Sequence, residues 1–488
     1  MMTWKNWLIP FSIVGCIPAV ALAEPLILSP QFVVDRTLTS SVEAKNIETK
    51  EALQKRSWYQ ARSKFDNKFT VNGSYEISKS ESLTQVFSND EDRTQSYGFG
   101  FSQKLPTGTN LEFTYARQTR SSELNSFAQA NGLSPDWSLD TLALNITQEL
   151  WQNLFGKADR LAVEVARENL KNASLQKIED YEQLVLTALN QFWAAYVAQQ
   201  NLQHSLASRD RFRNLVQTVQ NKSKLGFTAP GELAQSQADL EEQEQRVKSA
   251  SFTYLSAVDL LFKTLQMDPP SDVTFKVEDT LPAKPKEQSL VLDTNRSIQL
   301  AKQKLNMSQL ELESVESQQS PALNLVAEAS LTGGDAEPSE AFSEALSGTR
   351  PIYSVGLQFA TSFGSNLRQG ELAHFRSQVM EKEYALKIAK DQLSVAHLEA
   401  QREVNTHFKI AESASRQVSF RDKAVKEFER AYRQGRTDIF NVIQAYNSLF
   451  TNQTKAIRAI GDYHIALNKL AAIQDELIKI PQTEIKGR

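Results

Sequence analysis

The chain contains the same unusual order of elements twice, and this duplication restricts its possible folds more than any other feature. In each half, strand-like alternation is followed by a very long run of helix-forming residues with one short break. The matched segments are Phe69–Tyr75 with Leu323–Ala329, Leu142–Ile146 with Val355–Phe359, and Leu225–Leu233 with Gln434–Val442. Duplicated units of strands and long helices favour a transport or scaffold architecture over an enzyme fold.

Composition excludes several classes of protein. The chain has 488 residues, of which 23% are charged and 41% hydrophobic, so it is typical of neither a disordered protein nor a bundle of membrane helices. Its net charge of -4 argues against a nucleic-acid-binding protein, which needs a basic surface. Beyond the N-terminus, no apolar run approaches the roughly 20 residues of a spanning helix. Any membrane-spanning part must therefore consist of β-strands, whose sequence signal is weak.

The N-terminal segment is predicted to be a signal peptide covering residues 1–23. Lys5 supplies the positive charge, an apolar stretch follows, and Ala21-Leu22-Ala23 forms a cleavage site. Cleavage there would remove Cys16, the single cysteine, and leave no thiol chemistry. The alternative is lipidation of Cys16, because Ile13-Val14-Gly15-Cys16 resembles a lipobox. The apolar stretch continues past Cys16, which favours simple cleavage.

Aromatic residues alternate with small or polar residues in a predicted hairpin on either side of Leu105-Pro106-Thr107-Gly108. This pattern is typical of barrel strands with one face toward lipid. The residues expected to face lipid are Tyr97, Phe99, Phe101, Leu111, Phe113 and Tyr115. A strand of a soluble sandwich gives the same pattern, but the secretory signal favours a barrel. The second half has no matching hairpin, and the sequence leaves open whether this insertion (94–131) adds strands or forms an external loop.

Long helices follow the strands in both halves. No Gly or Pro occurs from Lys157 to Leu225, a span of roughly 100 Å if it is continuously helical. The last helical arm has a heptad-like apolar seam that begins at Ile439 and ends near Ala471, so it should pack lengthwise against other helices. A long coiled coil with a purely structural role would show the same seam.

These patterns divide the chain into nine parts. They are a signal peptide (1–23), an N-terminal extension with a first helix (24–63), strands of the first repeat with the extra hairpin (64–150), the first long helical hairpin (151–267), an equatorial connector (268–294), a helix of the second repeat (295–320), strands of the second repeat (321–364), the second long helical hairpin (365–478) and a C-terminal tail (479–488).

Three motifs, taken with their order, resemble the TolC family of outer-membrane channel proteins. They are Ala431–Ala445, which matches the family's Tyr-x-x-Gly turn followed by Asp-Val-Leu-x-Ala, Pro321–Leu325 between a helix and a strand, and Gln148–Trp151 between a strand and a helix. The resemblance covers Ser41 to Ile478. It implies an α+β membrane protein: a homotrimer whose strands form one β-barrel in the outer membrane, continuous with a periplasmic α-helical barrel.

The resemblance also assigns partners and contact residues. A periplasmic adaptor protein and an inner-membrane transporter are expected to dock at the helical turns. The glycines of these turns permit the backbone to reverse, and Thr437-Asp438 restarts a helix. The expected adaptor-contact residues are Leu225, Gly226, Phe227, Thr228, Gly435, Arg436, Thr437 and Asp438. Simple helix capping would explain the same residues.

The family closes its pore near these turns with polar and charged side chains, and some members have rings of aspartate there. This sequence departs from that pattern, because Asn441 and Gln444 are neutral and Glu232 and Gln235 occupy the equivalent places in the first repeat. We therefore expect weaker cation selectivity and weaker block by multivalent cations. Tyr432 and Arg436 are candidates for bonds that hold the constriction closed.

No set of residues indicates catalysis, so we expect neither enzyme activity nor a cofactor. The five histidines, His204, His374, His397, His407 and His464, lack the spacing of a metal site. Gly98-Phe99-Gly100 lacks the third glycine of a nucleotide-binding loop.

The sequence therefore predicts an outer-membrane exit duct of a tripartite efflux pump or a type I secretion system. Its partners should include outer-membrane lipid and no nucleic acid. The alternative is a periplasmic coiled-coil structural or adaptor protein without a pore. The sequence does not identify the cargo.

Overall fold

The computed structural model describes residues 26–79, 91–123, 130, 134–270, 273–277, 281–286 and 289–478. The predicted signal peptide, Cys16 and the C-terminal tail (479–488) lie outside these residues. The chain forms two units: a helical unit (1–41, 187–285 and 405–466) and a sheet unit (42–186, 286–404 and 467–488). Three of the five boundaries fall inside helices, namely α4 (Lys157–Lys224), α8 (Asn366–Arg433) and α9 (Ile439–Ile473).

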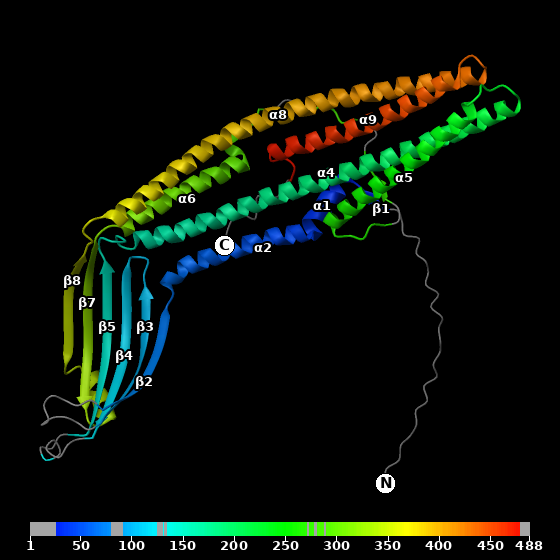
Figure 1. The fold of residues 1–488 in the computed structure, drawn as a ribbon. Coiled ribbons are helices and arrows are strands. Elements are labelled where there is room, and N and C mark those ends of the chain that lie inside the picture. Colours follow the sequence, from blue (N-terminus) through cyan, green and yellow to red (C-terminus); the bar gives the residue numbers. More distant parts are fainter. Residues whose placement is uncertain are drawn as a thin grey trace, which may run out of the picture. The chain divides into compact units, whose positions relative to one another are not determined.

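The sheet unit contains one antiparallel sheet of six strands in the order β2-β3-β4-β5-β7-β8 (Figure 1). The strands are β2 (Lys68–Ser78), β3 (Asp92–Lys104), β4 (Thr109–Ser122), β5 (Asp136–Glu149), β7 (Ala322–Asp335) and β8 (Pro351–Ala360). The extra hairpin of the first half is β3–β4, and it pairs with β2 on one side and β5 on the other. The structure thus answers the question left by the sequence: the insertion adds two strands to the sheet.

The strand register separates an apolar face from a polar face. Phe99 lies opposite Val71 on one neighbouring strand and opposite Tyr115 on the other, and their side chains share one face because facing residues point the same way. Gly98 and Gly100 belong to the opposite face, with Thr114 across from Gly100. We call these two sides the aromatic face and the small-residue face.

A short helix that the sequence analysis did not predict covers one end of the aromatic face. This helix, α7 (Pro338–Ser347), lies between β7 and β8, and its Ala341 and Ala345 are fully buried. A Cβ on Gly333 would lie 2.1 Å from the Ala341 carbonyl oxygen, so only glycine lets the helix pack this closely. Two residues could have indicated this helix from the sequence: Pro338 in its first turn and Gly348 at its C-cap. In the structure, Gly348 has a φ of 67°.

Helices α2 (Val42–Arg62) and α6 (Arg296–Gln318), with two short 3-10 turns at Ser63–Phe65 and Leu292–Thr294, complete the sheet unit together with parts of α4, α8 and α9. Asn295 caps α6, because its side-chain oxygen accepts a hydrogen bond of 3.1 Å from the Ser297 backbone N–H.

The helical unit contains α1 (Pro30–Ser40), α5 (Glu232–Leu265) and a parallel strand pair, β1 (Leu26–Leu28) with β6 (Val273–Phe275). The segment expected to be an extension at the N-terminus therefore contains an ordered strand and helix. Leu28 and Val33 anchor them, since both side chains are fully buried in a core with Phe192 and Phe262. Burial of these apolar side chains stabilises the strand and helix against the rest of the helical unit.

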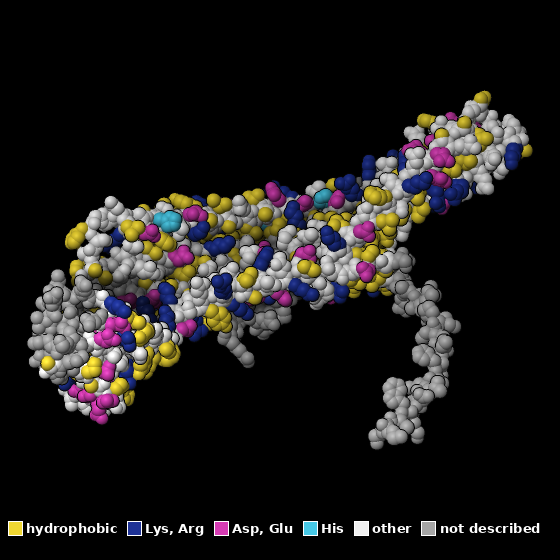
Figure 2. Space-filling view, turned by 60° about the horizontal axis from the view of Figure 1, so that its bottom comes forward, with side chains coloured by type: hydrophobic (Ala, Val, Ile, Leu, Met, Phe, Trp, Pro, Cys, Tyr) yellow, Lys and Arg dark blue, Asp and Glu magenta, His cyan; other side chains and the backbone are white. Residues whose placement is uncertain are grey.

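The predicted seam of α9 packs as expected near its start. Ile439, Val442, Ile443 and Leu449 are buried in a second core, which also contains Phe212 of α4. None of the helices in the described part of the chain combines the length and the apolarity needed to cross a lipid bilayer. Charged side chains of both signs are interspersed with hydrophobic ones over the face shown in Figure 2.

Candidate functional site at the helical turns

The two helical turns begin with the same backbone geometry. In the first, the Phe227 N–H donates to the Lys222 carbonyl oxygen at 2.9 Å, and in the second the Arg436 N–H donates to the Ala431 carbonyl oxygen at 2.8 Å. Gly226 and Gly435 precede these donors with φ values of 76° and 72°. This is the Schellman ending of a helix, which requires a left-handed residue and therefore favours glycine.

The turns differ in how the next helix restarts. In the second turn, the Asp438 carboxylate accepts a 3.1 Å hydrogen bond from the Asn441 backbone N–H, which is an ordinary N-cap. In the first turn, the N-cap is Gly231, whose φ is 89° and which has no side chain to cap with. Helix α5 consequently begins six residues after Gly226, whereas α9 begins four residues after Gly435.

Despite this difference, the buried positions of the two hairpins correspond. Leu233 and Leu240 pack against the second core, and they are separated from Val442 and Leu449 by the offset that separates Gly226 from Gly435. The same offset relates Glu232 to Asn441 and Gln235 to Gln444, so the equivalence expected from the sequence matches the packing of the helices.

Lys222 joins the two turns, which lie side by side (Figure 1). Its Nζ donates a 2.6 Å hydrogen bond to the Tyr432 carbonyl oxygen and lies 3.8 Å from the centre of the Tyr432 ring. Tyr432 is buried, and burial together with the nearby Glu232 carboxylate raises the pKa of its phenol to about 12. Lys222 is a residue that the sequence analysis missed, because no motif marks a lysine in the last turn of a helix as a bridge.

The predicted constriction residues are only partly brought together. Tyr432 and Glu232 are close, whereas the Arg436 side chain is exposed and makes no hydrogen bond or ion pair within the described residues. The Asn441 amide donates to Thr437 Oγ1 at 3.0 Å, so it braces its own turn. Gln444 and Gln235 are exposed.

Gln235 is hydrogen-bonded to a carboxylate, that of Asp239, which the sequence analysis did not consider. Its amide donates to Asp239 Oδ2 at 3.1 Å, one helical turn further along α5. Asp239 therefore adds a second acidic side chain to the start of the first repeat's hairpin.

Two of the eight expected adaptor-contact residues have exposed apolar side chains. Leu225 is 70% exposed and Phe227 77% exposed, and Phe440, which the sequence analysis did not single out, is 68% exposed. Gly226, Gly435 and Asp438 are also exposed, while Thr228 and Thr437 are half-buried. Exposed aromatic and aliphatic side chains are common anchors of protein interfaces.

The residues expected to face lipid share the aromatic face of the sheet. Tyr97, Phe99, Phe101 and Phe113 are exposed, and Leu111 is half-buried. Tyr115 differs, because its hydroxyl donates to Asp140 at 2.7 Å and its ring packs edge-on against Phe342 of α7. The Arg117 guanidinium then pairs with the buried Asp140 carboxylate at 2.8 Å, so the apolar part of this face ends there.

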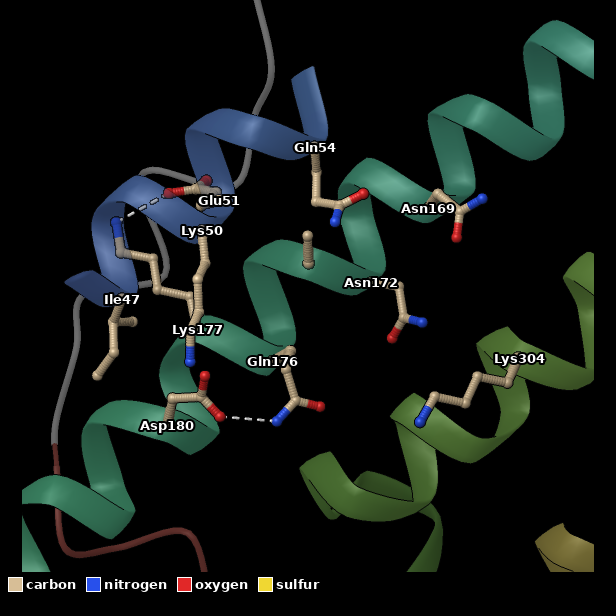
Figure 3. Close-up of a pocket in the computed structure, with 11 residues that line it drawn as sticks. Ile47, Lys50, Glu51, Gln54, Asn169, Asn172, Gln176, Lys177, Asp180 and Lys304 are labelled. Atoms are coloured by element: carbon tan, nitrogen blue, oxygen red, sulfur yellow. Dashed lines mark hydrogen bonds and ion pairs between the residues drawn. The ribbon is translucent and has the colours of Figure 1, made fainter. Parts of the chain in front are cut away.

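A polar hollow of about 370 Å³ lies among α2, α4 and α6 of the sheet unit (Figure 3). Lys50, Asn172 and Lys304 line it, together with Lys177, whose Nζ lies 3.0 Å from Glu51 Oε2. It is only partly enclosed, and its amide and ammonium groups do not form the enclosed apolar pocket typical of a small-molecule site.

Three carboxylates, those of Glu179, Glu182 and Asp475, lie close enough together to hold a metal ion. The Arg296 guanidinium occupies their centre, contacting Glu182 and lying 3.2 Å from Asp475 Oδ1. Burial raises the pKa values of Glu179 and Asp475. A guanidinium supplies the positive charge that these carboxylates need, so the cluster is a structural ion network.

Crystal structures of outer-membrane proteins share this fold. CusC, described in terms of transmembrane channel formation, has a TM-score of 0.70 and 12% identity, covering 91% of each chain. The CmeC outer membrane channel of Campylobacter jejuni has a TM-score of 0.69 and 13% identity, covering 99% of this chain and 97% of its own. VceC, an outer membrane protein of Vibrio cholerae, has a TM-score of 0.66 and 13% identity, covering 91% and 96%.

No family model and no curated relative matches the chain. The structural likenesses confirm, at the level of the fold, the resemblance that the sequence motifs predicted.

Proposed function

We propose that this chain, which has the fold of TolC-family outer-membrane channels, is the outer-membrane exit duct of a tripartite efflux pump or type I secretion system. It conducts substrate passively from the periplasm to the exterior, with its strands in the outer membrane and its helices in the periplasm. The observation that carries the proposal is a sheet with an exposed apolar face and two unpaired edges.

The edges support a barrel built from several chains. All residues of β8 and nearly all of β2 are exposed, and neither strand has a partner on its outer side within the described residues. A lipid bilayer does not tolerate unpaired strand edges, because their N–H and C=O groups would lack hydrogen-bond partners. The sheet must therefore close against copies of itself to serve as a membrane element.

A diagonal row of tyrosines supports the lipid-facing assignment. Tyr75, Tyr97 and Tyr115 lie on three neighbouring strands of the aromatic face, and each is displaced by two residues in register from the last. A row that crosses strands diagonally becomes level when the strands tilt, as they do in a barrel. Aromatic side chains gather at membrane interfaces in this way.

An uncovered apolar stripe on α8 supports assembly into a homotrimer. Exposed hydrophobic side chains recur at helical spacing along the part of α8 in the sheet unit; they are Met380, Tyr384, Ile388, Val395 and Leu398. Such a stripe is the half of a helix–helix interface that a second chain would cover. A solitary periplasmic coiled coil would not also need the aromatic face of the sheet, so the alternative without a pore is less well supported.

The helical turns are the proposed gate and docking point. Lys222 holds the first hairpin to the second through the Tyr432 carbonyl and ring, which favours a closed arrangement. Leu225, Phe227 and Phe440 offer an adaptor protein the exposed apolar anchors of a contact surface. An inner-membrane transporter would supply the energy and the choice of cargo.

Single-channel recording in planar bilayers tests this proposal. Replacing Lys222→Met removes the hydrogen bond and the cation–π contact, so we expect the open probability to rise about tenfold, in line with a loss of about 1.4 kcal/mol. Lys224→Met, an exposed lysine two residues further along the same helix, is the matched control and should behave as the native protein.

Equal open probabilities for Lys222→Met and native channels would contradict the gating role. A protein that purifies from the periplasm without detergent and gives no current steps would instead favour the structural coiled coil.

A further inference from the structure

We infer that hairpin β3–β4 is part of the barrel wall, so that three copies close a barrel of about 18 strands with a wide, water-filled exit. The number of copies rests on the proposed function, whereas the six strands per copy come from the sheet itself. Figure 1 shows β3 and β4 between β2 and β5, with β2 and β8 as the two outer strands.

Continuous pairing places the hairpin in the wall. β3 pairs with β2 from Lys68–Ser102 to Ser78–Asp92, and β4 pairs with β5 from Thr109–Gln148 to Ser121–Asp136, without interruption on either side. Phe99 contacts aromatic rings on both flanking strands, at 6.3 Å from Phe69 and 5.3 Å from Tyr115. In this sheet β2 pairs with β3 on its inner side, so a wall without the hairpin would need β2 to change its partner to β5.

The two free edges are complementary in direction, length and face. Five successive antiparallel pairings make β8 run opposite to β2, so the β8 of one copy can extend the sheet beside the β2 of the next. Strand β2 has 11 residues and β8 has 10, so their lengths match. In one possible register, Phe69 of one copy lies opposite Phe359 of the next, and Val71 lies opposite Leu357. This register keeps the aromatic face continuous across the two copies, because all four residues belong to that face.

Neither edge carries a device that blocks such pairing. Charged residues on β2 are confined to Lys68 and Glu76, near its ends, and β8 has none; its only proline, Pro351, is the first residue. Soluble proteins protect long edge strands with central charges, bulges or prolines. Their absence from these two strands fits a second copy as the occupant.

The small-residue face of the hairpin leaves the interior open. Gly98, Gly100 and Ser102 on β3, with Thr114 and Ala116 on β4, point away from the aromatic face. Side chains this small cannot fill a large barrel, and the longer side chains on the same face of the hairpin, Glu112, Gln118 and Arg120, are polar or charged. Barrels of about 16–18 strands contain aqueous channels.

Strand count determines the width of the exit. With strands about 4.8 Å apart and tilted by about 40°, a barrel of about 18 strands has a backbone radius of about 18 Å. If the hairpin lay outside the wall, about 12 strands would remain and the radius would be about 12 Å. The proposed exit therefore admits far bulkier cargo.

Distances between spin labels in the assembled protein distinguish the two widths. We would place one label at Glu328→Cys, on the small-residue face of β7, in a chain whose Cys16 is replaced by serine. Three identical backbone positions on a barrel of this size should lie about 31 Å apart, against about 21 Å if the hairpin is excluded, so the measured distances are first corrected for the length of the inward-pointing labels. Native mass spectrometry of the same sample counts the copies.

A hairpin deletion provides the second variant. Replacing residues 79–136 with Asn-Gly joins β2 to β5, which already run antiparallel, and sets Ser78 opposite Trp137 so that the faces stay in register. We expect the backbone distance derived from the labels to shrink by about a third while three copies remain.

Three copies with a native distance near 21 Å, or with the same distance after deletion, would overturn the inference and leave the proposed duct intact. A copy number other than three would overturn the proposed trimer itself. If the deletion variant does not fold, the native distance still decides between the two widths.

Discussion

At the scale of single residues, the glycines of the helical turns adopt a conformation that other residues reach only with strain. Gly435 has a φ of 72° and no atoms near the place of a Cβ, so replacing it should cost conformational energy alone. We expect Gly435→Ala to lower the free energy of unfolding by about 1 kcal/mol. Urea unfolding of the detergent-solubilised protein measures this.

Gly370→Ala is the control, because Gly370 lies in open space within α8. It should raise stability by up to about 1 kcal/mol, since alanine favours helix. A loss of stability at both positions would contradict the role assigned to the left-handed backbone of Gly435.

A second residue-scale prediction concerns His464, whose ring stacks on Trp193 at 3.8 Å. Burial lowers the pKa of His464 from 6.5 to about 4, so the folded chain holds it neutral. In the unfolded chain His464 takes up a proton near its ordinary pKa, which favours unfolding. The free energy of unfolding should therefore fall by up to about 3 kcal/mol as the pH falls from about 6.5 to 4. His464→Phe should abolish this share of the acid sensitivity in urea titrations, whereas His374→Phe, at an exposed ring, should not.

At the scale of elements, the Arg296 network joins α6 to α4 and to the chain just after α9. Removing the guanidinium leaves three carboxylates close together, two of them with pKa values already raised by burial. We expect Arg296→Met to cost about 3–5 kcal/mol of unfolding free energy. Lys302→Met, which breaks an exposed pair with Asp293, should cost less than about 1 kcal/mol. Similar losses would show that the network has no special role.

The elements also show how far periodicity predicts this fold. The long helices and paired strands were foreseeable, because unbroken 3.6- and 2-residue periods continue for many turns and residues. Helices α1 and α7 were not, because each is short and depends on a few buried contacts such as Val33 and Ala341 with distant segments. At the turns, motifs indicated Gly226 and Gly435, whereas the bridge from Lys222 to Tyr432 depends on packing between hairpins that no local pattern encodes.

At the scale of the whole molecule, the neutral residues that the second repeat places at the tip, Asn441 and Gln444, predict weak block by multivalent cations. Asn441→Asp with Gln444→Asp adds two carboxylates per copy, which a trimer would gather into rings. We expect block by trivalent cations to tighten at least tenfold in bilayer recordings. Gln417→Asp with Ser419→Asp, which adds equal charge at exposed sites on α8, should leave block unchanged. Tight block of the native channel would contradict this account of the tip.

The insertion of β3 and β4 as a pair has a consequence for how such ducts diversify. After an even number of added antiparallel strands, the chain is again at the same end of the sheet. Strands β5, β7 and β8 therefore keep their directions, and every helix keeps its point of attachment. The calibre of the outer opening can thus change by whole hairpins while the docking end stays constant. Under the proposed function, chains with the same helical turns would serve the same docking partner through openings of different bore.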